Sequence, residues 1–320
     1  MHTSTTRRQH EAGSVADWLA VHTSTRFAKH VACSVLLTLQ NFNKIPSLSP
    51  TNQLLWCSPS SANEVNNDNC ETFGRFHDCS TVNWVRRNLH PPSEKDYKLS
   101  HTGKRRRQLG NGTIDNSQYG QMALIIDRYL KHRTGGRYLE VGAHDGEHLS
   151  NSLVLERFYN WTGVLIEPYA RSFRSLLTKN RKAFALNACL SNVRRMTRMN
   201  FSPSGLGGIL TGGSPENQKL PAFTCIPISA VFAALNWTRL NFLSLDVDGK
   251  EPEVLLSVPW HAVQIDVVQV ECNDCHPMSV NTSRNHDKRF FLKTFMTALG
   301  YVETDFLYLD FIYILKTATE

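Results

Sequence analysis

Acidic residues follow short apolar runs at four places in the C-terminal two-thirds of the chain. These residues are Glu140, Glu167, Asp246 and Glu271. Such runs predict buried strands of a parallel sheet, in which ligands bind at the carboxyl ends of the strands. Carboxylates gathered there can accept hydrogen bonds from hydroxyl groups, face a cationic group or take up a proton.

The first of these acids is followed by a loop with two glycines, in "RYLEVGAHDGEH" at residues 137–148. Gly142 and Gly146 do not complete the G-x-G-x-x-G pattern of a dinucleotide site, so a pyrophosphate ligand is not expected. The acids around the loop favour a ligand with a cationic end, and S-adenosylmethionine has one. Glu167 stands where an acid would accept hydrogen bonds from ribose hydroxyls. The alternative for the glycines is a tight turn without a ligand.

Residues 115–320 alternate strand and helix patterns, which predicts an α/β fold with a mostly parallel sheet covered on both faces. Residues 301–304 and 311–315 predict an antiparallel C-terminal hairpin. A glycine-rich stretch at 202–215 is expected to be flexible. The expected strands are 138–141, 163–166, 183–190, 223–228, 241–245 and 265–270, and the expected helices are 121–130, 149–158, 172–179, 230–235, 253–258 and 289–299.

Residues 1–114 differ in character and are expected to be a basic, largely disordered N-terminal region. Their basic run at 104–107 fits a nuclear address, a nucleic-acid contact, a protease site or a solvated linker, and the linker is favoured. No aromatic residues interleave with it, so no nucleic-acid partner is predicted. The apolar run at 31–39 is too short to span a membrane and favours an amphipathic or buried segment.

The eight cysteines and the N-x-S/T sequons favour an oxidising, secretory compartment. Cys189 and Cys225 lie in extended segments that are expected to be neighbours, so a disulfide between them is predicted. The C-x-x-C-H pattern at 272–276 fits haem attachment, zinc or redox chemistry, but a disulfide or an incidental pair is favoured. No other His/Cys pair has zinc-ligand spacing, and no metal site is predicted. The sequons are at Asn111, Asn160, Asn236 and Asn281.

Five motifs resemble the FkbM-type methyltransferases in the right order. They are "SQYGQ" (117–121), "YLEVGAHDGEHLSNS" (138–152), "WTGVLIEP" (161–168), "NACLS" (187–191) and "NFLSLDVDGKEPEVL" (241–255). The resemblance implies a Rossmann-like, class I S-adenosylmethionine-dependent methyltransferase domain over residues 115–320. Within the family, residues 150–191 look closest to the branch that contains the animal Star protein.

The resemblance also implies roles for individual residues. Asp246 matches the acid nearest the methyl-transfer centre, and Asp246 and Asp248 are the predicted catalytic residues. The family loop commonly has Asp where Glu140 stands, and the family's "DVEG" is "DVDG" here. Asp248 could instead cap the next helix, and His144 could simply be exposed. The predicted cofactor-binding residues are Glu140, Gly142, Ala143, His144, Gly146, Glu167, Asn187 and Ser191.

These patterns predict methyl transfer from S-adenosylmethionine to an oxygen acceptor. The alternative is a non-catalytic, Star-like regulator that moves growth-factor ligand precursors from the endoplasmic reticulum to the Golgi, endosomes and plasma membrane. Membrane association would then require an anchor, and no transmembrane segment is visible in this sequence.

Overall fold

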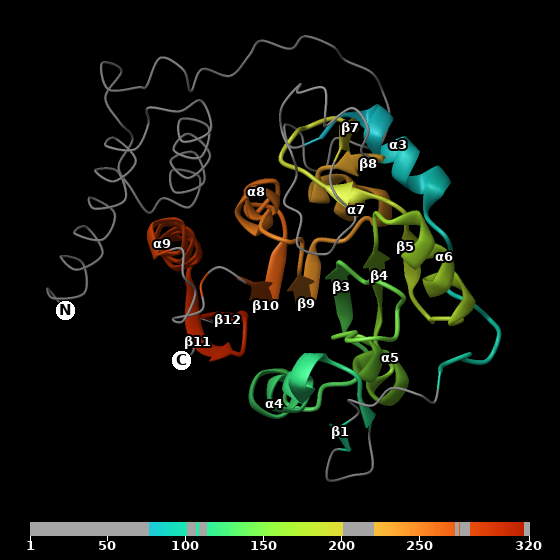
Figure 1. Cartoon of the computed structure of the whole chain (residues 1–320), viewed down its shortest axis with the longest axis horizontal. Helices are drawn as coiled ribbons and strands as arrows, with labels where there is room; N and C mark the ends of the chain where they lie inside the picture. The colour runs from blue at the N-terminus through green and yellow to red at the C-terminus, as the bar shows by residue number, and fades with distance from the viewer. Residues whose placement is uncertain are drawn as a thin grey trace, which may run out of the picture.

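The computed structural model describes residues 77–100, 107–108, 114–200, 221–272, 275 and 282–316 (Figure 1). The predictions for the region before residue 77 and for the glycine-rich stretch lie outside these ranges. Among the described residues, no helix is both long and apolar enough to cross a membrane.

A seven-stranded sheet forms the centre of the fold, in the order β11-β12-β10-β9-β3-β4-β5 (Figure 1). From β10 to β5 all neighbouring strands are parallel, whereas β12 is antiparallel to both β10 and β11. The predicted mostly parallel sheet with an antiparallel C-terminal hairpin is therefore confirmed. The strands are β3 (Arg137–Val141), β4 (Thr162–Ile166), β5 (Phe184–Leu186), β9 (Arg239–Leu245), β10 (Gln264–Glu271), β11 (Tyr301–Leu307) and β12 (Asp310–Leu315).

The order of the strands reverses between β3 and β9. From β3 the chain continues to β4 and β5 on one side, and it later returns through β9 and β10 on the other. Open parallel sheets bind their ligands at such a reversal, outside the carboxyl ends of the strands. Because Val141 pairs with Leu245 across the two strands, the next residues, Gly142 and Asp246, leave the sheet side by side.

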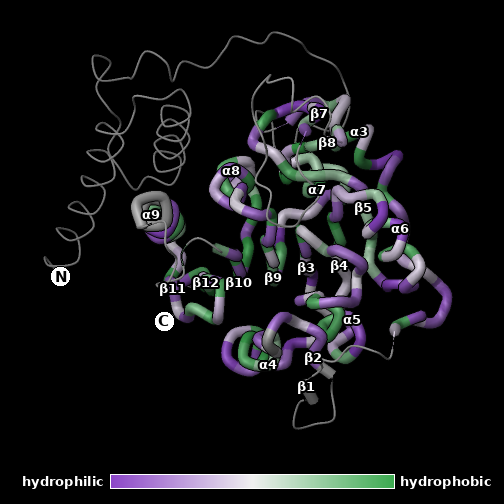
Figure 2. Tube along the Cα trace, in the orientation of Figure 1, coloured by the Kyte–Doolittle hydropathy of each residue, from purple (hydrophilic) through white to green (hydrophobic). Residues whose placement is uncertain are grey.

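Helices cover both faces of the sheet because side chains alternate along each strand. In β3, Tyr138 packs into one apolar cluster, whereas Leu139 and Val141 pack into the other. Figure 2 shows how strongly hydrophobic α7 is, which agrees with its nearly complete burial. The Tyr138 face carries α4 (Gln121–Ile125), the π-helical turn η3 (Ile126–Leu130), α5 (Leu153–Tyr159) and α6 (Ala170–Thr178); the other carries α3 (Cys79–Asn88), α7 (Ile228–Leu235), α8 (Glu251–Leu256) and α9 (Thr282–Ala298).

The predicted single strand at 183–190 is wrong, because the chain divides there between two sheets. β5 ends at Leu186, and β6 (Cys189–Leu190) joins a separate three-stranded sheet with β8 (Ala222–Ile226) and β7 (Thr197–Asn200). Cys189 lies directly opposite Cys225, and the predicted disulfide between them is present. Cys272 and Cys275 also form a disulfide, as favoured over haem or zinc.

Residues 79–88 depart from the expected low order of the N-terminal region, because they form α3. Asp78 begins this helix by accepting a hydrogen bond from the Thr81 N–H at 2.8 Å. Val82 and Val85 are fully buried in the same apolar cluster as α7. One amphipathic helix in a Ser-, Pro- and Asn-rich segment gives too few apolar residues for a clear sequence pattern. A two-stranded pair, β1 (Arg107–Gln108) with β2 (Ile114–Asp115), follows.

Candidate functional site

The glycine loop directly follows β3 and begins at Gly142. Gly142 and Gly146 both have left-handed backbones, with φ of 86° and 75°. A Cβ atom on Gly142 would lie 2.1 Å from the backbone oxygen of Asp246, so no side chain fits there. The N–H groups of Gly142 and Ala143 both donate to the Ile166 carbonyl, at 3.0 and 3.1 Å. Glycine at 142 is therefore required by the contact between β3 and β9 as well as by the turn.

Glu140 lies beneath this loop and is buried. Its carboxylate accepts hydrogen bonds from the Ser150 hydroxyl at 2.9 Å, the Asn151 N–H at 2.7 Å and the Ser152 hydroxyl. These bonds fix residues 150–152 just before α5. The structure thus shows Glu140 holding the protein's own loop, and its predicted contact with a cofactor stays a prediction.

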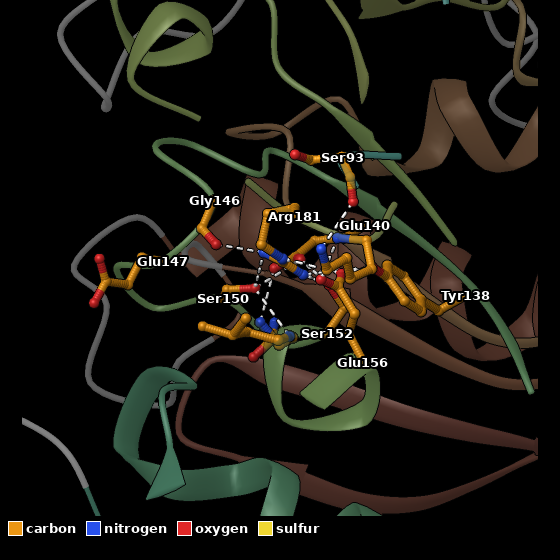
Figure 3. A network of polar contacts seen from close by, with 12 residues as sticks. Ser93, Tyr138, Glu140, Gly146, Glu147, Ser150, Ser152, Glu156 and Arg181 are labelled. Carbon is orange, nitrogen blue, oxygen red and sulfur yellow. Dashed lines mark hydrogen bonds and ion pairs between the residues drawn. The ribbon is translucent and has the colours of Figure 1, made fainter. Parts of the chain in front are cut away.

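A buried arginine that was not among the predicted site residues lies behind the same loop (Figure 3). Arg181 donates to Glu156 at 3.0 Å, to the Gly146 carbonyl, to the Ser150 and Ser152 hydroxyls and to the Tyr138 hydroxyl. Burial alone would lower the pKa of Arg181, but the carboxylate of Glu156 raises it above its ordinary value. The guanidinium therefore ties the Gly146 end of the glycine loop to Tyr138 of β3 and to the start of α5.

Glu167 follows β4 and faces the glycine loop. Its two carboxylate oxygens accept one backbone hydrogen bond each, from His144 at 2.9 Å and from Tyr169 at 2.7 Å. Burial raises the pKa of Glu167, although these hydrogen bonds lower it. Each oxygen has a second lone pair, so the carboxylate can still accept hydrogen bonds from hydroxyl groups.

The remaining predicted cofactor residues differ in their contacts. The Asn187 amide donates to the carbonyls of Glu167 and Pro168, at 2.8 and 3.0 Å, so it shapes the chain after β4. Ser191 is buried, and its hydroxyl has no hydrogen-bond partner among the described residues. The His144 side chain is 59% exposed and lies 3.8 Å from Asp145. The backbone of His144 contacts Glu167, while its ring faces solvent.

The predicted catalytic residues lie in the loop after β9. The Asp246 N–H donates to the Val141 carbonyl at 3.1 Å, and Asp248 has a left-handed backbone with φ of 50°. Asp248 does not cap the next helix, because the N-cap of α8 is Lys250. The loop is held by Glu251, which accepts hydrogen bonds from the Val247 and Gly249 N–H groups at 3.1 and 3.0 Å.

Glu271, at the end of β10, completes an acidic group with Asp246 and Asp248. One carboxylate oxygen of each lies within 4.8 Å of the others. Burial raises the pKa of Asp246, and the neighbouring Glu271 raises it further. Burial and the nearby Glu251 carboxylate likewise raise the pKa of Asp248. The site therefore combines a glycine loop, a buried acid after β4 and an acidic group after β9 and β10.

A family comparison identifies this arrangement. The model of the methyltransferase FkbM domain matches residues 140–302, slightly more than half of the chain. This protein belongs to the FkbM methyltransferase domain family. The matched segment begins at Glu140 and includes the glycine loop, Glu167 and all three members of the acidic group. No protein with a curated description matches the chain.

Several solved methyltransferases align with this FkbM-domain chain. The FkbM methyltransferase from Methylobacillus flagellatus KT is 12% identical with a TM-score of 0.35, and the alignment covers 56% of this chain and only 43% of that one. Fibrillarin from Aeropyrum pernix, with natively bound S-adenosyl-L-methionine, is 13% identical, covers 68% and 84% and has a TM-score of 0.36. SAH-bound PaMTH1 from Podospora anserina is 9% identical, covers 85% and 100% and has a TM-score of 0.34.

Proposed function

We propose that this protein binds S-adenosylmethionine where β3 and β9 part and transfers its methyl group to an oxygen acceptor. The observation that carries the proposal is the Glu167 carboxylate, which is held by the backbone of His144 in the glycine loop. This contact places the buried Glu167 carboxylate, which can accept hydrogen bonds from hydroxyl groups, beside the glycine loop. At Gly142 the loop packs so closely against Asp246 that no side chain fits there. The membership in the FkbM family supports the same conclusion.

The residues of the site fit the chemistry of this cofactor. The Glu167 carboxylate would accept hydrogen bonds from the ribose hydroxyls, and the unpartnered Ser191 hydroxyl offers a hydrogen bond on the side of β6. The backbone of the loop that holds Gly142, Ala143 and Gly146 would contact the methionine end, while the two glycines allow the turn and its close packing against Asp246 and Leu176. The acidic groups after β9 and β10 favour a cation, and the cofactor supplies a methyl group on a positively charged sulfur.

Asp246 and Asp248 are the proposed residues beside the acceptor. Methyl transfer is a direct displacement, so the protein must align the acceptor oxygen with the methyl group and receive the charge of the departing proton. Carboxylates at the end of β9 are well placed for both tasks, because Asp246 directly neighbours Gly142. A hydroxyl group as the methyl acceptor agrees with the many carboxylates at this site, since a carboxylate would accept a hydrogen bond from that hydroxyl.

Calorimetric titration of the full chain with S-adenosylmethionine tests the proposal. We expect saturable binding, weakened at least about tenfold in Glu167→Gln, because a charge-assisted hydrogen bond contributes about 1.5–3 kcal/mol. Glu253→Gln is the matched control, since Glu253 is an acid on α8 that pairs with Lys250 at 3.0 Å. Absence of binding by the folded wild-type chain at millimolar cofactor would refute the proposal.

A second candidate is a non-catalytic Star-like regulator of growth-factor ligand precursors in the secretory pathway. Every cysteine that the structure describes is disulfide-bonded, which favours an oxidising compartment. Two sequon residues, Asn160 and Asn236, are exposed at the ends of α5 and α7. Cofactor binding without methyl transfer to any hydroxyl-bearing glycan, lipid or peptide fraction would favour this candidate.

A further inference from the structure

The acidic group at the centre of the site has the spacing of ligands around one ion. Leu245 of β9 pairs with Val270 of β10, so the next residues, Asp246 and Glu271, lie at the same level. Asp248 follows two residues later, on the left-handed turn that Glu251 holds. All three offer an oxygen within 4.8 Å of the other two. Two ligands of an ion bound at about 2.0–2.6 Å cannot be more than about 5 Å apart, and this group meets that limit.

The two nearby lysines form their ion pairs with other carboxylates, although the charge of Lys288 lowers the pKa of Asp248. Lys288 of α9 lies 2.7 Å from Glu251, and Lys250 lies 3.0 Å from Glu253. Within the part of the chain that the structure describes, Asp246, Asp248 and Glu271 form no ion pair with Lys, Arg or His. Like charges at this separation repel one another unless a cation lies between them.

Glu271 provides a second observation, because it is buried and incompletely bonded. Its residue is 5% exposed, and its Oε2 atom accepts no hydrogen bond from the described residues. Gln269, two residues earlier on the same face of β10, is 1% exposed, and its Oε1 atom is likewise without a donor. The Asp246 and Glu271 carboxyl groups hydrogen-bond to one another, which leaves the second oxygen of Glu271 without a partner. A buried carboxylate oxygen without a donor is energetically unfavourable, and a cation at this edge of the site would remove that cost.

We propose that Asp246, Asp248 and Glu271 bind a divalent cation with hard, oxygen-preferring chemistry: Mg²⁺, Mn²⁺ or Ca²⁺. The ligand atoms are all carboxylate oxygens, with no thiolate or imidazole that would favour zinc. Ions of this class are commonly held by a few carboxylates and complete their coordination with water or substrate oxygens. Asp248 is only half-buried, so water or a substrate oxygen can reach the ion from the exposed side of this residue.

The inference rests on the proposed function and changes the role of Asp246 and Asp248 from bases to ligands. A divalent ion at this position would bind the acceptor oxygen and make its hydroxyl more acidic. The hydroxyl proton would leave to water, the O–CH₃ bond would form as the S–CH₃ bond breaks, and the products would be a methyl ether and a neutral thioether. Acceptors with two neighbouring oxygens, such as a vicinal diol or a 2-hydroxy acid, would bind such an ion best.

The test is titration of the full chain with MnCl₂ in the absence of S-adenosylmethionine. Binding is measured by calorimetry and by the electron paramagnetic resonance signal of free Mn²⁺. We expect one saturable site with a dissociation constant between about 1 μM and 1 mM. Asp248→Asn should weaken it at least about tenfold. Asn tolerates the left-handed backbone of residue 248, so this variant should fold. Glu271→Gln should have the same effect, and Glu253→Gln is the matched control.

Two results would overturn the cation site. One is the absence of saturable Mn²⁺ binding up to about 10 mM, far above the expected range. The other is equal binding by the wild type, Asp248→Asn and Glu253→Gln. A separate titration of the wild-type chain with S-adenosylmethionine distinguishes the two proposals. In the wild type, cofactor binding without Mn²⁺ binding refutes only the cation site, and Mn²⁺ binding without cofactor binding refutes only the proposed function.

Discussion

The Gly142 Cα and the Asp246 carbonyl are in direct contact across the gap between β3 and β9, so that a Cβ on Gly142 would lie 2.1 Å from the Asp246 oxygen. This contact joins the proposed cofactor loop to the proposed acceptor side. It also shows how closely the two strands pack at the point where the ligand is expected.

Gly142→Ala should therefore destabilise the protein more than an ordinary glycine substitution. A left-handed alanine costs about 1–2 kcal/mol, and overpacking adds about 1–3 kcal/mol, so we expect a loss of about 2–5 kcal/mol. Gly135→Ala is the control, because Gly135 is also left-handed, with φ of 69°, but a Cβ added there would have no atom within 4 Å. Urea unfolding measures both, and equal losses would show that the contact with Asp246 is unimportant.

Cofactor affinity should depend on pH through Glu167. Burial raises the pKa of this carboxyl above its ordinary value of 4.5, so it becomes protonated at a higher pH than an exposed glutamate. Only the ionised form accepts hydrogen bonds at both oxygens, so affinity should fall as the pH is lowered toward and through that raised pKa. Calorimetry across pH 4–8 measures this dependence. Glu167→Gln should bind weakly and lose the dependence, and an unchanged dependence in this variant would assign it to another group.

Arg181→Met should strongly destabilise the fold because it leaves Glu156 without its buried partner. Arg181 is 3% exposed, and breaking such a pair costs about 3–5 kcal/mol. The control is Arg239→Met, since Arg239 pairs with Asp266 at the same 3.0 Å but its side chain is 55% exposed. That surface pair should contribute less than about 1 kcal/mol. Thermal unfolding of the two variants compares them, and similar melting temperatures would contradict the prediction.

Ser191→Ala should weaken binding of S-adenosylmethionine without lowering the stability of the fold. The Ser191 hydroxyl is buried without a partner, so removing it should leave the melting temperature unchanged or raise it. If the hydroxyl contacts the cofactor, the same variant should bind S-adenosylmethionine more weakly, by up to about tenfold. A fall in melting temperature with unchanged affinity would instead give Ser191 a structural role.

Much of the fold could be predicted from the sequence because apolar periodicity and strand-end acids are local signals. They predicted four of the five parallel strands and the hairpin, and they located Gly142, Glu167 and Asp246. Prediction failed where contacts are distant in sequence. Arg181 follows a polar helix and looks like a solvated residue, but Glu156 and the loop at 150–152 bury it.

The sequence pattern also failed to predict that residues 183–190 divide between two sheets. β5 and β6 form one nearly continuous apolar run, and only the hydrogen bonds of Asn187 to the chain after β4 interrupt it. The sequence placed Asp246 and Glu271 at the same edge of the sheet but predicted no cation site there. Which of the strand-end acids approach one another depends on strand order, and the pairing of β9 with β10 is what brings these two to one level.

The place of the hairpin in the sheet has a consequence for synthesis of the chain. Residues 267–271 of β10 pair with residues 310–314 of β12, which the ribosome adds about forty residues later. Until then β10 is an open edge strand, and Glu271 lies at that open edge beside an unpaired backbone. The acidic side of the site is thus the last part to be enclosed, while the glycine loop and Glu167 can take shape earlier on the nascent chain.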